Sequence, residues 1–152
     1  MEKENVLISA CLLGKNTRYD GKNQNIPLLH NLVNFYNLIP FCPEVEGGLK
    51  IPRDPSEISG DKVISIKGKD VTRNFNAGAF LALSICKQMN IKLAILKEES
   101  PSCGVNKIHD GTFKNVIING RGVTTKKLID NNIKVINEND ALKLLQEKEN
   151  EN

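Results

Sequence analysis

The sequence predicts a single α/β domain built on a Rossmann-like, open and mostly parallel sheet with flanking helices. Short apolar runs, which are typical of buried strands, alternate along the chain with amphipathic stretches at helical spacing. The chain has 152 residues, and neither a repeat nor a linker divides it. A chain of that length forms one domain that buries roughly 68–70% of its unfolded surface. We therefore assign residues 1–152 to one domain, with a polar tail at about 147–152.

Four apolar runs are expected to form the sheet, because each is short and is bounded by turn-forming residues. These strands are predicted at residues 6–8, 38–41, 93–96 and 133–136. A fifth run, residues 63–66, predicts a short extra strand. Residues 51–55 are rich in proline and are expected to form a loop. Residues 108–113 are expected to form a turn.

Helices are predicted between these strands. Pro27 suits the first position of a helix, and apolar side chains follow it at helical spacing. They are Leu28, Leu29, Leu32, Val33 and Tyr36. The longest helix is predicted at residues 71–89, with Asp70 as its N-cap. A short helix should end at Ile129, and a terminal helix around residues 141–145 should fray into the polar tail.

Composition argues against several classes of partner. The net charge is only +3, from 21 Lys and Arg against 18 Asp and Glu. Because no basic stripe is present, the sequence argues against binding to duplex nucleic acid. No apolar stretch approaches the roughly 20 residues that span a bilayer, so no membrane role is expected. The N-terminus is polar, and the four cysteines do not form a short secreted framework. We therefore expect a cytoplasmic protein with reduced thiols.

Three cysteines occupy equivalent places in the predicted sheet. Cys11, Cys42 and Cys103 each lie at or just beyond the carboxyl end of an apolar run. Ligands of open α/β sheets gather at that edge, so the three thiols converge if these strands are parallel neighbours. The fourth cysteine, Cys86, falls on the apolar face of the longest predicted helix, and we expect it to be a core residue.

Thiols gathered at one edge favour a metal or cluster site. Their spacing lacks the paired C-x2-4-C pattern, so a closed structural zinc site is not favoured. Iron–sulfur clusters usually take four thiolates. Three thiolates would leave one iron open as a Lewis acid for a soft atom such as sulfur. From the spacing alone, three unrelated core cysteines are an equal alternative.

Polar residues beside the cysteines favour the site. In an extended segment residues i and i+2 face the same side, so Glu44 should point where Cys42 points. A carboxylate there could exchange protons with a substrate. Ser100 and Ser102 flank Cys103 closely enough to donate hydrogen bonds to a ligand, with turn capping as their alternative role.

At these residues the chain resembles the thiouracil desulfidase family. The resemblance extends from about Val6 to Val135 and consists of many motifs in one order. They are SACLLG (9–14), RYDG (18–21), CPEV (42–45), GGL (47–49), PR (52–53), DVT (70–72), ILKE (95–98) and SPSCG (100–104). The chain departs from the family pattern at His109, where tyrosine is more frequent, and at Lys22, where glycine is common. Both departures bear on the choice of substrate.

The resemblance implies an α/β fold that carries a four-iron, four-sulfur (4Fe-4S) cluster. Carried over residue by residue, the cluster ligands are Cys11, Cys42 and Cys103. The same mapping makes Glu44 the acid/base of the reaction.

The resemblance also implies a catalytic serine in the turn before the third cysteine. It is Ser100 or Ser102, and the motifs do not separate the two. Leu13 and Tyr19 are candidate substrate contacts, because they lie in the first two motifs.

The family removes sulfur from thiolated uracil bases or nucleosides without redox chemistry. We accordingly predict a desulfidase in which the thiocarbonyl sulfur binds the open iron and water attacks the carbon. Glu44 would manage the protons, and hydrosulfide would be released. The expected partner is a small thiolated nucleobase or nucleoside, and a base within tRNA is left open.

Two other functions compete with this prediction. The first is a non-catalytic module that binds a metal or an iron–sulfur cluster for storage or sensing, which would need no carboxylate beside Cys42. The second is a transferase with Cys103 as its nucleophile. Such an enzyme needs a histidine base, and the chain contains only His30 and His109.

Overall fold

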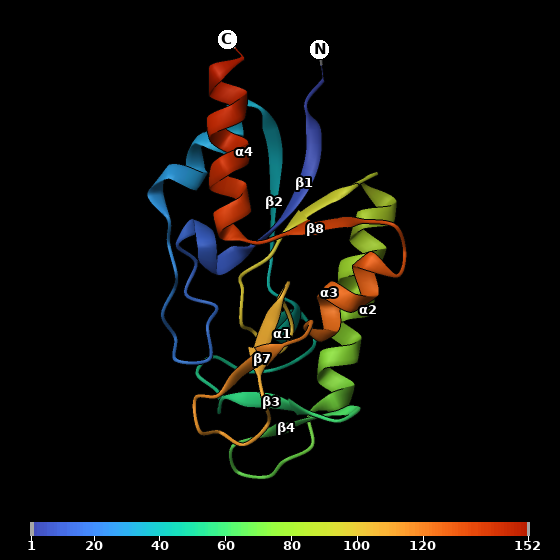
Figure 1. The fold of residues 1–152 in the computed structure, drawn as a ribbon. Coiled ribbons are helices and arrows are strands. Elements are labelled where there is room, and N and C mark those ends of the chain that lie inside the picture. Colours follow the sequence, from blue (N-terminus) through green and yellow to red (C-terminus); the bar gives the residue numbers. More distant parts are fainter. Residues whose placement is uncertain (1, 152) are drawn as a thin grey trace.

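The computed structural model describes residues 2–151 and confirms the predicted α/β architecture (Figure 1). Four strands form the main sheet in the order β2-β1-β5-β8, and neighbouring strands are parallel. They are β1 (Glu4–Ser9), β2 (Tyr36–Phe41), β5 (Leu93–Ile95) and β8 (Lys134–Ile136). Each overlaps one of the predicted apolar runs. The carboxyl ends of β1, β2 and β5 therefore meet at one edge, as the convergence of the cysteines requires.

Helices cover both faces of this sheet. Figure 1 shows α2 and α3 on one side and α4 and η2 on the other. The helices are η1 (Ala10–Leu13), η2 (Pro27–Asn34), α1 (Pro43–Glu46), α2 (Thr72–Gln88), α3 (Val123–Ile129) and α4 (Glu138–Asn150). Leu7 packs with residues of α2 and α3, whereas Val6 and Ile8 pack with residues of η2 and α4. Because consecutive side chains are buried on opposite faces of the sheet, residues 6–8 of β1 are all apolar and do not alternate with polar residues.

The helix predicted after Pro27 is a 3-10 helix, η2, and only part of its predicted apolar stripe is buried. Leu28 and Val33 are 60% and 50% exposed, and Tyr36 belongs to β2. A 3-10 helix has three residues per turn, so residues three apart share a face. Leu29 and Leu32 satisfy that spacing and are fully buried.

The longest helix begins one residue later than predicted. Its N-cap is Val71 and not Asp70, although the Asp70 carboxylate accepts a hydrogen bond from the Thr72 backbone N–H at 2.9 Å. The Thr72 hydroxyl oxygen in turn accepts a hydrogen bond from the Val63 backbone N–H at 2.9 Å. The helix ends at Gln88, one residue short of the predicted end.

Two small hairpins lie outside the main sheet. β3 (Ser56–Ser59) pairs antiparallel with β4 (Lys62–Ser65), and β6 (Lys107–His109) pairs antiparallel with β7 (Ile117–Asn119). The predicted strand at 63–66 is β4, but β3 was not expected. The predicted turn at 108–113 is wrong for its first two residues, which belong to β6. Figure 1 shows both hairpins beyond the carboxyl edge of the sheet.

The terminal helix extends further than predicted. α4 continues to Asn150, so the expected fraying from residue 147 is not observed. Its start is fixed by a reciprocal capping box, in which the Asn137 side chain accepts the Asp140 N–H at 2.9 Å. Such caps stabilise a helix by about 1 kcal/mol. Within residues 2–151, no helix has the length and apolar content needed to cross a bilayer.

Candidate active site

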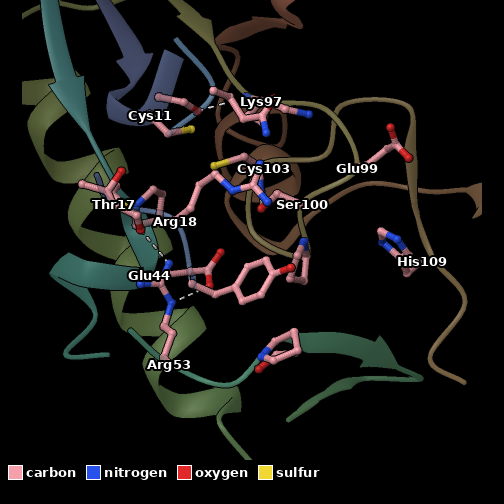
Figure 2. Close-up of a pocket in the computed structure, with 18 of the residues that line it drawn as sticks. Cys11, Thr17, Arg18, Glu44, Arg53, Lys97, Glu99, Ser100, Cys103 and His109 are labelled. Carbon is pink, nitrogen blue, oxygen red and sulfur yellow. Dashed lines mark hydrogen bonds and ion pairs between the residues drawn. The ribbon is translucent and has the colours of Figure 1, made fainter. Parts of the chain in front are cut away.

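A cavity of about 460 Å³ lies between the carboxyl edge of the sheet and the two hairpins. Its inner end is formed by residues that follow β1, β2 and β5. These include all three predicted ligands, Cys11, Cys42 and Cys103. Figure 2 shows Glu44 at this inner end and His109 at the opposite end. The hairpins contribute Pro55, Ser56, Glu57, Ile66, Phe113 and Asn115 to the walls.

Cys11 lies on η1, immediately after the central strand β1. The turn closes at Gly14, whose φ of 91° is in the left-handed region that favours glycine. Burial, together with the nearby Cys42, raises the pKa of the Cys11 thiol to about 11. The charges of Lys97 and Arg18 act in the opposite direction. Cations thus lie close enough to stabilise negative charge on this sulfur.

Cys42 directly follows β2 and is the N-cap of α1. Its Sγ donates a weak hydrogen bond to the Thr17 carbonyl at 3.7 Å. α1 lies unusually close to α2, because a Cβ added to Gly78 would come within 1.9 Å of the Pro43 carbonyl oxygen. A Cβ added to Gly47 would likewise come within 2.1 Å of the Asn74 carbonyl oxygen. Glycine at both positions therefore sets the position of the segment that carries Cys42.

Cys103 lies in the turn after β5 and is held by several hydrogen bonds. The Ser100 Oγ accepts the backbone N–H groups of Ser102 and Cys103 at 3.1 and 3.0 Å. The Thr125 hydroxyl donates to the Cys103 carbonyl at 2.9 Å. Burial raises the pKa of the Cys103 thiol, and the nearby Cys42 adds to this effect, whereas a hydrogen bond from Ser9 opposes it.

The donor set fits an iron–sulfur cluster better than a single metal ion. Each of Cys11, Cys42 and Cys103 influences the pKa of another member of the set or is influenced by it, so the three sulfurs are electrostatic neighbours. In the described part of the chain, however, no three His, Cys, Asp or Glu side chains surround one point closely enough to hold an ion. A cluster binds its thiolates through separate iron atoms. Soft sulfur ligands also select iron–sulfur clusters. Cys86 lies elsewhere, on the buried face of α2, as predicted.

Glu44 is a buried carboxylate at the inner end, and it is held by Arg53. The Arg53 Nε donates to the Glu44 Oε1 at 3.1 Å. Burial raises the pKa of Glu44, while the charge and hydrogen bond of Arg53 oppose the rise, as does the Ser100 hydroxyl. Arg53 also donates to the Thr17 carbonyl at 2.9 Å (Figure 2). The Arg53 guanidinium thus connects the Glu44 carboxylate to the Thr17 carbonyl, which also accepts the hydrogen bond from Cys42.

Sequence reasoning missed the role of Arg53, although its Pro-Arg motif follows the Cys-Pro-Glu motif closely. It also missed Ser9, a buried residue at the end of β1. The Ser9 Oγ accepts the Lys97 backbone N–H at 3.0 Å, and its hydroxyl faces Cys103. A small polar residue at the end of a buried strand was the available signal.

The structure separates the two candidate serines. Ser100 lines the cavity. Ser102 is fully buried, and its hydroxyl shares a 2.8 Å hydrogen bond with the Thr124 hydroxyl. The two candidate substrate contacts are separated as well. Tyr19 lines the cavity and is 40% exposed, whereas Leu13 packs against the core on the side of η2 and α4.

The sequence and the fold both match known proteins. The chain is similar to the uncharacterized protein YbbK of Bacillus subtilis (strain 168), with 37% identity over 150 residues that cover 92% of this chain and 99% of that protein. The structure of the present chain is similar to that of the 4Fe-4S-dependent thiouracil desulfidase TudS, with a TM-score of 0.87 and 44% sequence identity. That likeness covers 91% of this chain and 93% of the other. Residues 6–140 match the family described as 2-thiouracil desulfurase. The chain therefore belongs to the 2-thiouracil desulfurase family, as its motifs predict.

Proposed function

We propose that this protein removes sulfur from a thiolated uracil base or nucleoside and releases it as hydrosulfide. Family membership and the likeness to a 4Fe-4S-dependent thiouracil desulfidase support an iron–sulfur-dependent enzyme of this kind. The observation that carries the proposal is the convergence of three thiols and the buried carboxylate of Glu44 on a single pocket. A storage or sensing module needs the thiols and has no use for the carboxylate.

Cys11, Cys42 and Cys103 would hold the cluster, because all three line the inner end of the pocket. When bound, such a cluster supplies a Lewis-acidic iron with affinity for sulfur. The basic side chains of Lys97 and Arg18 lie near Cys11 and offset the negative charge of the thiolates. The inner end of the pocket thus suits the sulfur end of the substrate.

Glu44 manages the protons of the reaction. Water adds its oxygen to the thiocarbonyl carbon, the carbon–sulfur bond breaks, and sulfur leaves as hydrosulfide, so no electrons are gained or lost. Water gives up two protons: Glu44 accepts one, and the other leaves with the sulfur as hydrosulfide. Burial raises the pKa of Glu44 towards the range where a carboxylate both accepts and returns a proton, and Arg53 limits the rise. Arg53 also fixes the direction of the carboxylate.

Of the two serines, Ser100 acts on the substrate. Its oxygen already accepts two backbone N–H groups, so its hydroxyl proton is the part available for donation. That proton is directed to Glu44 or to a polar atom of the substrate. Ser102 instead ties the turn to α3 through Thr124.

The substrate is a small thiolated pyrimidine that enters between the hairpins. The wall it passes carries Tyr19, Phe113 and His109, whose rings offer flat surfaces for a base. A base within tRNA would have to leave its stack to reach the thiols.

The experiment is sulfide release by anaerobically reconstituted protein. Iron content, sulfide and the oxygen-containing product are measured with 2-thiouracil, 4-thiouracil and 4-thiouridine. We expect at least one substrate to yield equal amounts of hydrosulfide and product over many turnovers. Protein that holds its iron and releases no sulfide from any of the three would favour the storage or sensing module.

A further inference from the structure

Glu98 is the most heavily hydrogen-bonded carboxylate near the site, and the reaction proposed above does not use it. It follows β5, and its Oε1 accepts the backbone N–H groups of Val105, Asn106 and Lys107 at 2.7, 2.8 and 3.0 Å. Consecutive backbone N–H groups that point to one spot form an anion-binding nest. Here the anion in the nest is a side chain of the protein itself.

The second carboxylate oxygen of Glu98 is also occupied. It accepts the side-chain amides of Asn137 and Asn106 at 2.9 and 3.3 Å. The backbone N–H of Glu98 donates to the Glu138 carboxylate at 2.8 Å, and that carboxylate pairs with Lys97 at 3.1 Å. Glu98 therefore joins the end of β5, the loop after Cys103 and the start of α4. With both oxygens taken, it has no free lone pair for proton transfer.

Gly104, which connects Cys103 to the nest, is held by hydrogen bonds and close packing. Gly104 donates to the Ser100 carbonyl at 2.8 Å and accepts from Gly122 at 2.8 Å. A Cβ added to Gly104 would come within 2.5 Å of the Lys107 carbonyl oxygen. Displacement of residues 105–107 would therefore move Gly104, and with it the adjoining Cys103. Neither Cys11 nor Cys42 has a comparable connection to Glu98.

We propose that Glu98 is a positioning residue for Cys103: by holding residues 105–107, its carboxylate fixes the Cys103 sulfur where a cluster can bind. The inference rests on the proposed function only in taking Cys103 as a cluster ligand. Glu98 is ionised for this role, because hydrogen bonds from Asn137 and the loop outweigh burial and lower its pKa. Glu98 lines the pocket, but both of its carboxylate oxygens are occupied by hydrogen bonds, so we assign it a positioning role and not a catalytic one.

The test is Glu98→Gln, with Glu57→Gln as the matched control. Glutamine has the same shape, but its NH2 group must face donors, because both carboxylate oxygens accept hydrogen bonds from N–H groups. Glu57 is another buried carboxylate that accepts two backbone N–H groups, and its partners lie in the loop of the other hairpin. Residues that orient metal ligands typically contribute about 10- to 100-fold to metal affinity. We expect Glu98→Gln to weaken iron retention against a chelator by that factor, and Glu57→Gln to leave it within about twofold.

A second readout separates positioning of one ligand from general loosening. In the cluster-free full chain, the rate of iodoacetamide alkylation is measured at each cysteine by mass spectrometry. Glu98→Gln should accelerate alkylation of Cys103 and leave the rates at Cys11 and Cys86 near those of the wild type. A uniform rise at all three cysteines, or unchanged iron retention, would overturn the proposal.

A second variant tests the proposal if Glu98→Gln fails to fold. If Glu98→Gln does not fold, Asn137→Ala removes one donor to the carboxylate, and the same selective rise at Cys103 is expected with smaller size. Equal rates at Cys103 in that variant and the wild type would then overturn the proposal. Wild-type protein that keeps iron but releases no sulfide rejects the proposed function and leaves this inference standing, since both readouts are independent of turnover.

Discussion

The two walls of the pocket are built differently. The inner wall is the carboxyl edge of a buried parallel sheet, where the turns after β1, β2 and β5 carry the cysteines. The outer wall consists of two hairpins with strands of three or four residues, and all three residues of β7 are exposed. Glu98 anchors the inner wall through five hydrogen bonds from the loop and α4. Glu57 holds the outer loop through only two, from Gly111 and Phe113.

This difference suggests a division of labour. We propose that cluster ligation and proton transfer, which need fixed geometry, belong to the inner wall. Choice of substrate, which tolerates a more adaptable surface, would then belong to the outer wall. Changes to the inner wall should therefore alter iron content and kcat, and changes to the outer wall should alter KM.

The largest effect is expected from loss of a ligand. Cys103→Ser should reduce the iron bound by reconstituted protein from about four per chain to near zero, because serine is a poor ligand for iron in such clusters. Cys86→Ser is the control, since Cys86 lies in the core away from the pocket. Retained iron in Cys103→Ser together with lost iron in Cys86→Ser would contradict the ligand assignment.

The next effect concerns the contact between α1 and α2. Gly78→Ala places a methyl group 1.9 Å from the Pro43 carbonyl oxygen, so α1 must move with Cys42 and Glu44. Overpacking of this kind costs about 1–3 kcal/mol, which exceeds the gain of about 1 kcal/mol in helix propensity. Urea unfolding and iron content should both reveal the loss. Asn76→Ala, on an exposed position of the same helix, should show no loss in either measurement.

A smaller effect tests the outer wall. Glu57→Gln keeps an acceptor for Gly111 and Phe113 but loses the charge, and charged hydrogen bonds are roughly twice as strong as neutral ones. The loop should loosen, and we expect KM to rise about fivefold, with a smaller change in kcat and iron content unchanged. A fall in kcat at constant KM would break the proposed division between the walls.

The smallest effect is a pH dependence. Hydrogen bonds lower the pKa of Glu98 below its ordinary 4.5, although burial alone would raise it. Its contribution to stability is therefore present above about pH 4.5 and is lost as the pH falls through the lowered pKa. Urea unfolding of the cluster-free chain should show a difference between wild type and Glu98→Gln that is constant near neutral pH and shrinks below pH 4.5. A difference that grows with acidity would contradict the proposed role of the ionised Glu98 carboxylate.

The same division explains what the sequence could predict. The sheet strands were predictable because burial on both faces makes them continuous apolar runs. Since each of the three cysteines follows one of these runs, their place at the carboxyl edge of the sheet was predictable too. The β6–β7 hairpin was missed, since its strands have three residues and its loop contains Phe113 and Asn115 at positive φ. Pairing, not periodicity, defines such strands. Likewise, nothing local distinguishes Ser100 from Ser102, because only the fold brings Thr124 to one of them.

The proposed function requires that Glu44, a carboxylate at the inner wall, performs proton transfer beside the cysteines that would hold the cluster. The most direct test is Glu44→Gln, which keeps the size of the side chain and an acceptor for Arg53 but removes the titratable group. Sulfide release per iron from the best thiolated substrate is compared in the two proteins. We predict unchanged iron content and a rate lower by about 10²- to 10⁴-fold, the usual contribution of general acid–base catalysis. Equal rates per iron in wild type and Glu44→Gln would show that Glu44 takes no part in the proton transfer.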